Sequence, residues 1–250
     1  MNDLYGWLLG QTAGQAVPVD SVLLGLSWTV ASVDGGLGFS FSPRLVPRTL
    51  DWAGTLQGRS SHELCHWLSS WNEAEAAVGL SVLNALVNNR PAACWRQAVP
   101  LREEAPGHLQ VFAHFRSRVI GQKVVVIGRY PALDRLWADV PYQCVERNPQ
   151  EGDFPDAAAE YLLPQADWVF ITASSLANKT LPRLLQLSRQ ARVVLMGPSM
   201  PWLEGWKDWG VNYLAGVRVV DAAAARQVAA EGGGTRLFAG PVEYSLLALD

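Results

Sequence analysis

The chain has 250 residues, of which 49% are hydrophobic and only 17% are charged, and its formal net charge is −3 at pH 7. These values predict a well-packed globular protein of one large or two modest domains, and they exclude an intrinsically disordered chain. A pI near 5.8 and the lack of any basic run give no attraction for a phosphate backbone, so we expect no nucleic-acid partner.

The N-terminal segment and the cysteines bear on cellular location. The first apolar run has no preceding positive charge and is interrupted by Gly10 and Gln11, which is typical of neither a signal peptide nor a membrane helix. The cysteines, Cys65, Cys94 and Cys144, are far apart and odd in number, which suits a reducing compartment. We therefore expect a cytoplasmic protein with no membrane partner.

The chain begins with a predicted amphipathic helix at residues 2–16, followed by two strands. The strands are predicted at 21–33 and 37–43, and Asp34-Gly35 between them supplies the positive φ angles of a tight hairpin turn.

Two predicted helices follow the hairpin. The first, at 60–71, begins with serines placed to cap it, and the second, at 72–89, begins with Asn72 as its cap. The first part of the chain is therefore a ββαα unit. Residues 90–107 are rich in proline and charge, which indicates a linker or an irregular crossover.

From residue 108 onward, apolar runs alternate with helical or loop-rich segments. A helix is predicted at 108–117, and a last strand at 238–247 follows the glycine run 232–234. The other predicted strands lie at 123–128, 142–147, 168–173, 192–197 and 213–220. Strands that alternate with helices imply parallel βαβ units with right-handed crossovers.

The sequence thus predicts an α/β protein. Its two expected domains are a ββαα domain over residues 1–105 and a Rossmann-like, doubly wound, mostly parallel sheet domain over residues 106–250. The eleven tryptophans are expected to fill the core or a subunit interface, and the latter would suit a homodimer.

The loops that follow the parallel strands define a candidate site, because the carboxyl ends of parallel strands meet at one edge of a sheet. Small residues there let a ligand approach the backbone, and free N–H groups at helix starts favour anions. We expect Gly128, Arg129 and Gly197 to contribute to ligand binding. The loops are GRYP (128–131), ERNPQEGDFPD (146–156), SSLANKT (174–180) and GPSMP (197–201).

Two interpretations of Asp153 and Asp156 remain open. They flank a proline at a predicted helix start, where Asp153 as the N-cap and Asp156 in the first turn would satisfy orphan amides. Alternatively, their carboxylates would bind a metal ion or a substrate, and oxygen ligands suit the harder cations.

Glu146 ends the second parallel strand, where dinucleotide-binding folds place the acid that holds a ribose. The first loop is GRYP, however, and lacks the GxGxxG fingerprint. An enzyme that binds a nucleotide or an S-adenosylmethionine-like cofactor through Glu146 is therefore the alternative hypothesis.

Asn178, Lys179 and Thr180 form a candidate anion site at a helix start, with Lys179 as a point charge. Thr180 is equally placed to cap the helix that begins at Leu181. Ser199 has no GxSxG context, so we expect it to orient a ligand by hydrogen bonding and not to act as a nucleophile.

His62, Cys65 and His66 form the other candidate metal group. Their i, i+3 and i+4 spacing can place them on one helix face, and such a face can hold zinc. HELCH is not the HExxH motif, however, and Cys65 can equally face the core.

Several long segments together resemble a family of two-domain bacterial and archaeal proteins to which heavy-metal chelation is ascribed. The resemblance covers nearly the whole chain and is strongest from Asn72 to Asp221. The segments that carry it are NEAEAAVGLSVLNALVNN, KVVVIGRYP, ERNPQEGDFPDAAAEYLLPQADWVFIT, LANKTLPRLLQL, VVLMGPSMP and GVNYLAGVRVVD.

The resemblance implies a first domain like the capping domain of enolases, a Rossmann-like second domain, and a site where the two meet. It implies that GDFPD, NKT and GPSMP form this site, with Asn84 contributed by the first domain. Our leading hypothesis is that the protein binds a transition-metal ion, or a metal-containing or chelating small molecule, in the crevice between the domains.

Overall fold

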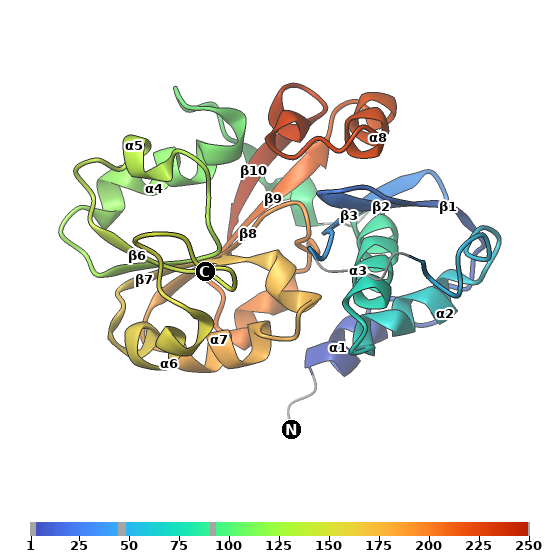
Figure 1. Cartoon of the computed structure of the whole chain (residues 1–250), viewed down its shortest axis with the longest axis horizontal. Coiled ribbons are helices and arrows are strands. Elements are labelled where there is room, and N and C mark those ends of the chain that lie inside the picture. The colour runs from blue at the N-terminus through green and yellow to red at the C-terminus, as the bar shows by residue number, and fades with distance from the viewer. Residues whose placement is uncertain (1–3, 45–48, 91–93, 250) are drawn as a thin grey trace.

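This computed structural model describes residues 4–44, 49–90 and 94–249, which form two units lying side by side (Figure 1). The smaller unit packs three helices against a three-stranded antiparallel sheet with strand order β1-β2-β3. Its strands are β1 (Val19–Leu24), β2 (Trp28–Val33) and β3 (Gly36–Phe41), and its helices are α1 (Leu4–Gly10), α2 (Ser61–His66) and α3 (Glu73–Asn88).

The predicted hairpin at Asp34-Gly35 is confirmed, because both residues have positive φ angles (48° and 74°) and β2 pairs with β3. The prediction of one strand over 21–33 is wrong. The chain turns back after Leu24, which lies opposite Thr29 in the β1–β2 pairing. The isolated glycine at position 25 was the signal for this turn, so the unit is βββαα and not ββαα.

The second predicted helix of this unit is confirmed in detail. Asn72 caps α3 by accepting hydrogen bonds from the amides of Ala74 and Glu75. Helix α2 has Ser60 in the N-cap position, as the serines predicted, but the Ser60 side chain makes no capping hydrogen bond. The hydroxyl of the next residue, the buried Ser61, donates to the carbonyl of Gln15. Helix α1 is also shorter than the predicted 2–16, of which residues 2 and 3 lie outside the described residues.

The larger unit is built on a seven-stranded sheet of order β4-β10-β9-β8-β7-β5-β6. All neighbours from β9 to β6 pair in parallel, whereas β10 and β4 are antiparallel. The predicted mixed α/β fold and its strands are thereby confirmed. The strands are β4 (Val99–Pro100), β5 (Val124–Ile127), β6 (Tyr142–Val145), β7 (Trp168–Thr172), β8 (Arg192–Met196), β9 (Tyr213–Val219) and β10 (Val242–Ala248).

The predicted linker at 90–107, of which 91–93 lie outside the described residues, contributes the edge strand β4 and so belongs to the sheet. Short 3₁₀ helices lie at Trp67–Ser69, Cys94–Gln97, Gly107–Leu109, Asp156–Ala158, Leu163–Gln165, Ala173–Leu176, Glu204–Trp209 and Thr235–Phe238.

Helices cover both faces of the large sheet, α4 and α5 on one and α6 and α7 on the other, while α8 packs against β1 and β2 of the small unit (Figure 1). Successive strand residues serve the two faces in turn, since Val125 and Val124 belong to different buried clusters. These helices are α4 (Gln110–Val119), α5 (Leu133–Leu136), α6 (Ala159–Leu162), α7 (Leu181–Leu187) and α8 (Ala222–Ala230).

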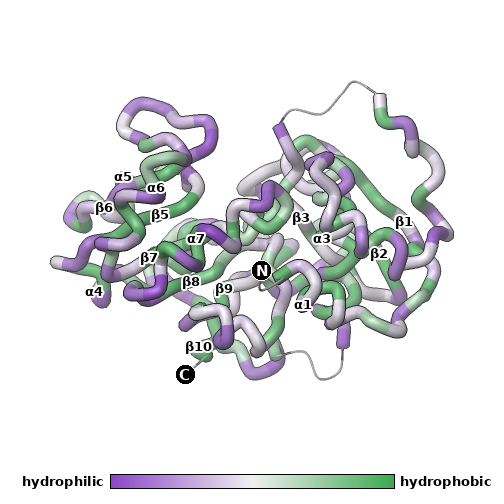
Figure 2. The backbone as a smooth tube through the Cα atoms, turned by 90° about the horizontal axis from the view of Figure 1, so that it is seen from below, coloured by the Kyte–Doolittle hydropathy of each residue, from purple (hydrophilic) through white to green (hydrophobic). Residues whose placement is uncertain are grey.

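The two units share their core. One buried cluster includes Leu83 of α3 and Ile171 of β7, and the other includes Phe39 of β3 and Phe170 of β7, so the smaller unit contributes to both buried clusters of the large sheet. In Figure 2 the central strands of the large sheet are coloured largely hydrophobic, as strands buried on both faces should be. This shared packing fixes the loops of the two units against each other.

Within the described residues, no helix combines the length and the hydrophobicity that a membrane crossing requires.

Candidate ligand-binding site

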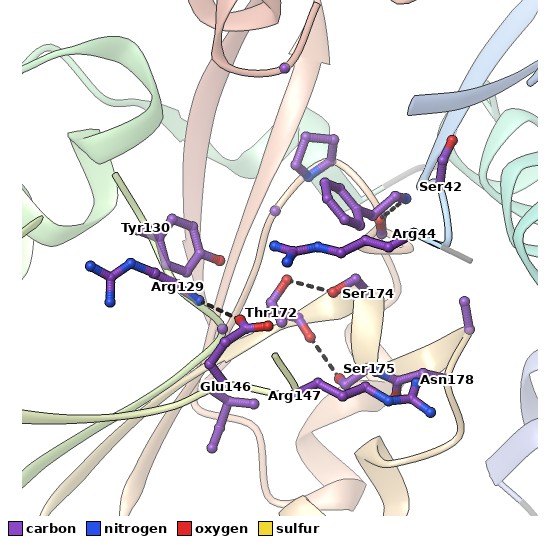
Figure 3. A pocket seen from close by; sticks show the side chains of 18 of the residues that line it. Ser42, Arg44, Arg129, Tyr130, Glu146, Arg147, Thr172, Ser174, Ser175 and Asn178 are labelled. Carbon is purple, nitrogen blue, oxygen red and sulfur yellow. Dashed lines mark hydrogen bonds between the residues drawn. The ribbon is translucent and has the colours of Figure 1, made fainter. Parts of the chain in front are cut away.

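A cavity of about 510 Å³ opens where the small sheet meets the carboxyl edge of the large sheet. Its lining includes Phe41 and Ser42 at the end of β3 and the loops after β5, β6, β7 and β8. The four loops predicted to converge therefore do so, and Figure 3 shows their side chains around the hollow.

Two glycines form the floor of the cavity where β5 and β8 end. Gly128 and Gly197 have φ angles of 97° and 110°, which other residues rarely adopt. A Cβ atom on Gly128 would lie 3.0 Å from Cγ2 of Thr172, so the absence of a side chain also lets β5 and β7 end close together. Both predicted glycines line the cavity.

Glu146 lines the cavity at the end of β6, and its carboxylate forms hydrogen bonds with the loops after β5 and β6. It accepts the backbone N–H of Arg129 (3.0 Å) and of Asn148 (3.1 Å), each on a different oxygen. Each carboxylate oxygen keeps a lone pair beyond its backbone donor, so these two hydrogen bonds fix the orientation of Glu146 and leave it able to accept from a ligand.

Arg129 and Asp153 form a pair whose charged groups are turned away from the hollow. Arg129 donates to both Asp153 oxygens (2.7 and 2.8 Å), and Figure 3 shows its guanidinium directed outward. Burial raises the pKa of Asp153, but the Gln150 amide and the Arg129 guanidinium outweigh burial and hold the pKa below its usual value. The Asp153 side chain is 3% exposed.

The helical turn after this loop begins at Asp156, with Pro155 in the N-cap position. The interpretation of Asp153 as the N-cap is therefore wrong, because its carboxylate binds Arg129 and the Gln150 amide. Asp156 lines the cavity, whereas the Asp153 carboxylate lies behind it. The structure thus separates two carboxylates that the sequence placed together.

Asp156 lies near charges of both signs. Burial raises its pKa, Arg147 opposes this rise, and the negative charge of Glu146 adds to it. Arg147 also pairs across the mouth of the cavity with Glu73 of α3, at 2.7 Å, and this ion pair joins the two units.

Hydroxyl groups fill the middle of the lining. Thr172 and Ser174 share a hydrogen bond of 3.0 Å at the end of β7, and Ser175 donates to the Thr172 carbonyl. Figure 3 shows this row between Glu146 and Ser42.

Asn178 and Thr180 also line the cavity, and the Asn178 side-chain oxygen accepts both the amide and the hydroxyl of Thr180. Lys179, between them, points elsewhere. Its amine donates to the carbonyl of Leu68 and lies 5.1 Å from the centre of the Tyr5 ring, so it ties the β7 loop to the small unit. Burial lowers the Lys179 pKa to about 8.

Ser199 lines the cavity, and Asn84 supports it from behind. The Ser199 hydroxyl accepts the backbone N–H of Phe41 (2.9 Å). The wholly buried Asn84 amide donates to the carbonyls of Phe39 (2.8 Å) and Ser199 (3.0 Å). Asn84 therefore joins β3 to the β8 loop and acts on the cavity through Ser199.

Several lining residues were missed by the sequence analysis. Tyr130 and Arg147 sit in the predicted loops, so position after a strand was a sufficient signal for them. Arg44 and His108 follow no parallel strand, and His108 reaches the cavity while its Nε2 donates to the Pro131 carbonyl (3.1 Å). Gly234, part of the glycine run taken as a mere break, also lines it.

His62, Cys65 and His66 do not share one open face, because both histidines are exposed whereas Cys65 is buried. Cys65 is fully buried, and burial raises the pKa of its thiol to about 12, while His66 donates to the His62 carbonyl. Among residues 4–44, 49–90 and 94–249, no three His, Cys, Asp or Glu side chains are grouped to hold a metal ion. The described carboxylates at the cavity would need oxygen atoms from elsewhere to complete a coordination sphere.

The fold and cavity define a class of two-unit α/β proteins in which a cavity is formed where a small antiparallel sheet meets a mostly parallel one. The chain belongs to a family described as "Putative heavy-metal chelation": a model of this description, DUF364, matches residues 110–248. A second model with the same description, DUF4213, matches residues 8–87. The resemblance inferred from the sequence is thereby confirmed.

Solved structures of the same family share the fold. A DUF364 protein of unknown function from Desulfitobacterium hafniense DCB-2 is 29% identical, with a TM-score of 0.83 and coverage of 98% of this chain and 97% of that one. A second DUF364 protein of unknown function, from Pyrococcus horikoshii, is 20% identical with a TM-score of 0.77 and the same coverage.

A curated relative matches over a shorter stretch. An uncharacterized protein of Methanocaldococcus jannaschii is 35% identical over 81 residues, which is 30% of this chain. The matched stretch spans about a third (31%) of the length of that relative.

Proposed function

We propose that the protein binds a transition-metal ion carried by an anionic organic chelator, in the cavity between its two units. The supporting observation is that Arg44 and Arg147 line the same 510 Å³ cavity as the carboxylates of Glu146 and Asp156. A cavity of this volume suits a small organic molecule. A lining of both charges suits a ligand that carries both, because guanidinium groups bind carboxylates and carboxylates bind cations.

Asp156 and Glu146 would face the metal in this proposal. Their negative charges lie close enough for Glu146 to raise the Asp156 pKa, after burial has raised it and Arg147 has opposed the rise. A cation near both would relieve that repulsion. The chelator would supply the remaining oxygen or nitrogen ligands, so a full set of protein ligands is unnecessary.

Arg147 would face the chelator. Its planar guanidinium can donate two parallel hydrogen bonds to one carboxylate, and it now donates a single one, from Nη1 to Glu73. An anionic ligand at the mouth of the cavity would compete with Glu73 for this group. Asn178, Thr180 and Ser199 would orient the ligand, and the turns at Gly128 and Gly197 would let it approach the backbone. Arg129, Asp153, Lys179 and Asn84 would hold the loops in place.

Equilibrium dialysis with metal analysis tests the proposal. The wild-type protein should retain about one cobalt(II) ion per chain when citrate is present and much less with cobalt(II) chloride alone. Arg147→Ala should weaken retention about tenfold or more, because the bidentate contact is lost. Arg183→Ala is the matched control, since Arg183 forms a similar surface pair with Glu160 (2.5 Å) away from the cavity.

The variant Asp156→Asn distinguishes binding of the metal from binding of the chelator. It should lower cobalt retention while leaving the binding of radiolabelled citrate nearly unchanged. Equal retention of cobalt with and without citrate would contradict the role of the chelator, and no retention under either condition would refute the proposal.

We propose further that the protein acts in the cytoplasm as a homodimer and without nucleic acid. Trp71 is 86% exposed on the small unit, and an exposed tryptophan is a common element of subunit interfaces. Light scattering coupled to size-exclusion chromatography should give twice the 27.3 kDa chain mass, and Trp71→Ser should shift it toward the monomer.

A further inference from the structure

The cavity has an aromatic end, and the small unit supplies one side of it. Trp28 of β2 and Phe41 of β3 line the hollow, with their rings edge to face at 5.4 Å. The Trp28 indole donates to the carbonyl of Gly234 (3.0 Å), which fixes it against the segment before β10. Phe41 is 38% exposed although it borders the core, so part of its ring is open to a ligand.

The large unit supplies the other side of the aromatic end. Phe238 and Tyr244 line the cavity with their rings stacked at 5.0 Å and an interplanar angle of 18°. His108 lies 6.5 Å from the Phe238 ring and is held by the Pro131 carbonyl. Four aromatic side chains from two units therefore border one hollow that they do not fill.

The other end of the cavity is polar. Arg147 and Glu73 pair there, and Asn178, whose side-chain oxygen accepts from Thr180, also lines the cavity. Figure 3 shows Arg147 and Asn178 on the side of the hollow opposite Tyr130 and Arg44. In the same figure the hydroxyl row of Thr172 and Ser174 lies between Arg147 on one side and Arg44 on the other.

We infer that the chelator bound here carries an aromatic ring, which lies among Trp28, Phe41, Phe238 and Tyr244 while its carboxylate groups face Arg147. The inference rests on the proposed function and narrows its ligand to aromatic carboxylates. The physical reason is that contacts between aromatic rings make binding more favourable than the buried area alone would. An aliphatic polyacid such as citrate makes no such contacts and would leave the aromatic end exposed to water.

A pair of ligands with the same acid groups tests the inference. Phthalate and cis-cyclohexane-1,2-dicarboxylate both present two adjacent carboxylates, and only phthalate has an aromatic ring. Competition dialysis against cobalt–citrate, with and without cobalt(II), should show phthalate binding the wild-type protein about tenfold more tightly.

Variants locate the effect at the aromatic end. Phe238→Leu and Phe41→Leu should each reduce the preference for phthalate several-fold and leave the affinity for the cyclohexane compound nearly unchanged. Tyr161→Leu is the control, because Tyr161 is a 75% exposed aromatic residue outside the lining. Circular dichroism melting checks that each variant folds, and the ligand comparison in the wild type needs no variant.

Two results would overturn the inference. One is equal binding of the two dicarboxylates to the wild type, and the other is an unchanged preference in both folded phenylalanine variants. Either result, with cobalt–citrate still bound through Arg147, leaves the proposed function standing. If neither dicarboxylate nor cobalt–citrate binds, the proposed function fails as well.

Discussion

Asp153 and Asp156 lie three positions apart and have opposite surroundings. Asp153 is enclosed between Arg129 and the Gln150 amide with its side chain 3% exposed, whereas Asp156 faces the cavity. Between them, the backbone of Phe154 forms a β-bridge with Val145 of β6, and this path of the chain directs the two carboxylates to different sides. A pattern of residue types carries no such direction, so the sequence left both interpretations of the pair open.

The Asp153 ion pair gives a prediction for stability. Asp153→Asn should lower the free energy of unfolding by about 1–3 kcal/mol at pH 7, since a charged hydrogen-bonded group is lost from a nearly buried position. Native hydrogen bonds hold the Asp153 pKa below its unfolded value, so this stabilisation is present above the unfolded pKa and is lost as the pH falls through the folded one.

Urea unfolding of wild type and variant across pH 7 to 3 measures this difference. The gap between the two proteins should close on acidification, and a constant gap would show that the charge of Asp153 is not its source. Asp139→Asn, which removes the exposed pair with Arg116, is the control and should have a much smaller effect.

For single residues, the sequence predicted which ones lie at the cavity better than it predicted what their side chains contact. Gly128, Glu146, Asn178 and Gly197 were identified because they follow strands, and all four line the cavity. Lys179 follows the same rule, yet its amine is turned toward the Leu68 carbonyl of the other unit. The partner of a side chain across two units depends on packing that no local pattern records.

At the scale of elements, α3 and β3 form the contact that positions the cavity. They pack so closely that a Cβ atom on Gly38 would lie 2.1 Å from the Ser81 carbonyl oxygen and 2.2 Å from the Ala85 nitrogen. Asn84 of α3 reaches Ser199 and Phe39 from this same contact. A change in the distance between α3 and β3 would therefore also move Ser199 in the lining of the cavity.

Gly38→Ala should destabilise the protein by about 3 kcal/mol or more, because backbone atoms on α3 would have to move. Thermal unfolding followed by circular dichroism measures this, with Gly10→Ala as the control because a Cβ atom there meets nothing within 4 Å. Equal melting temperatures for the two variants would contradict the close packing of α3 on β3.

The elements themselves were largely predictable, and the exceptions have clear causes. The strands of the large sheet are continuous apolar runs bounded by Gly or loop residues, which is the strongest short-range signal for buried strands. The turn between β1 and β2 was missed because a single glycine inside an apolar run usually indicates a β-bulge within one strand. The edge strand β4 has two residues, too few to show a period.

At the scale of the whole molecule, two units with a shared core enclose one mixed-charge cavity. The core cluster that includes Leu83 and Ile171, the Glu73–Arg147 pair and the Lys179 contact to Leu68 all join the units. The sequence predicted a site between two domains through its resemblance to a family, while the charges and aromatic rings that give the site its chemistry emerged only when distant segments were brought together.

A crystal structure of the protein soaked with cobalt(II) citrate tests the central claim most directly. Anomalous scattering at the cobalt edge should give one peak in the cavity beside Glu146 and Asp156, with a citrate carboxylate on the Arg147 guanidinium. A peak elsewhere, such as beside His62 and His66 on α2, together with a cavity free of citrate, would contradict it.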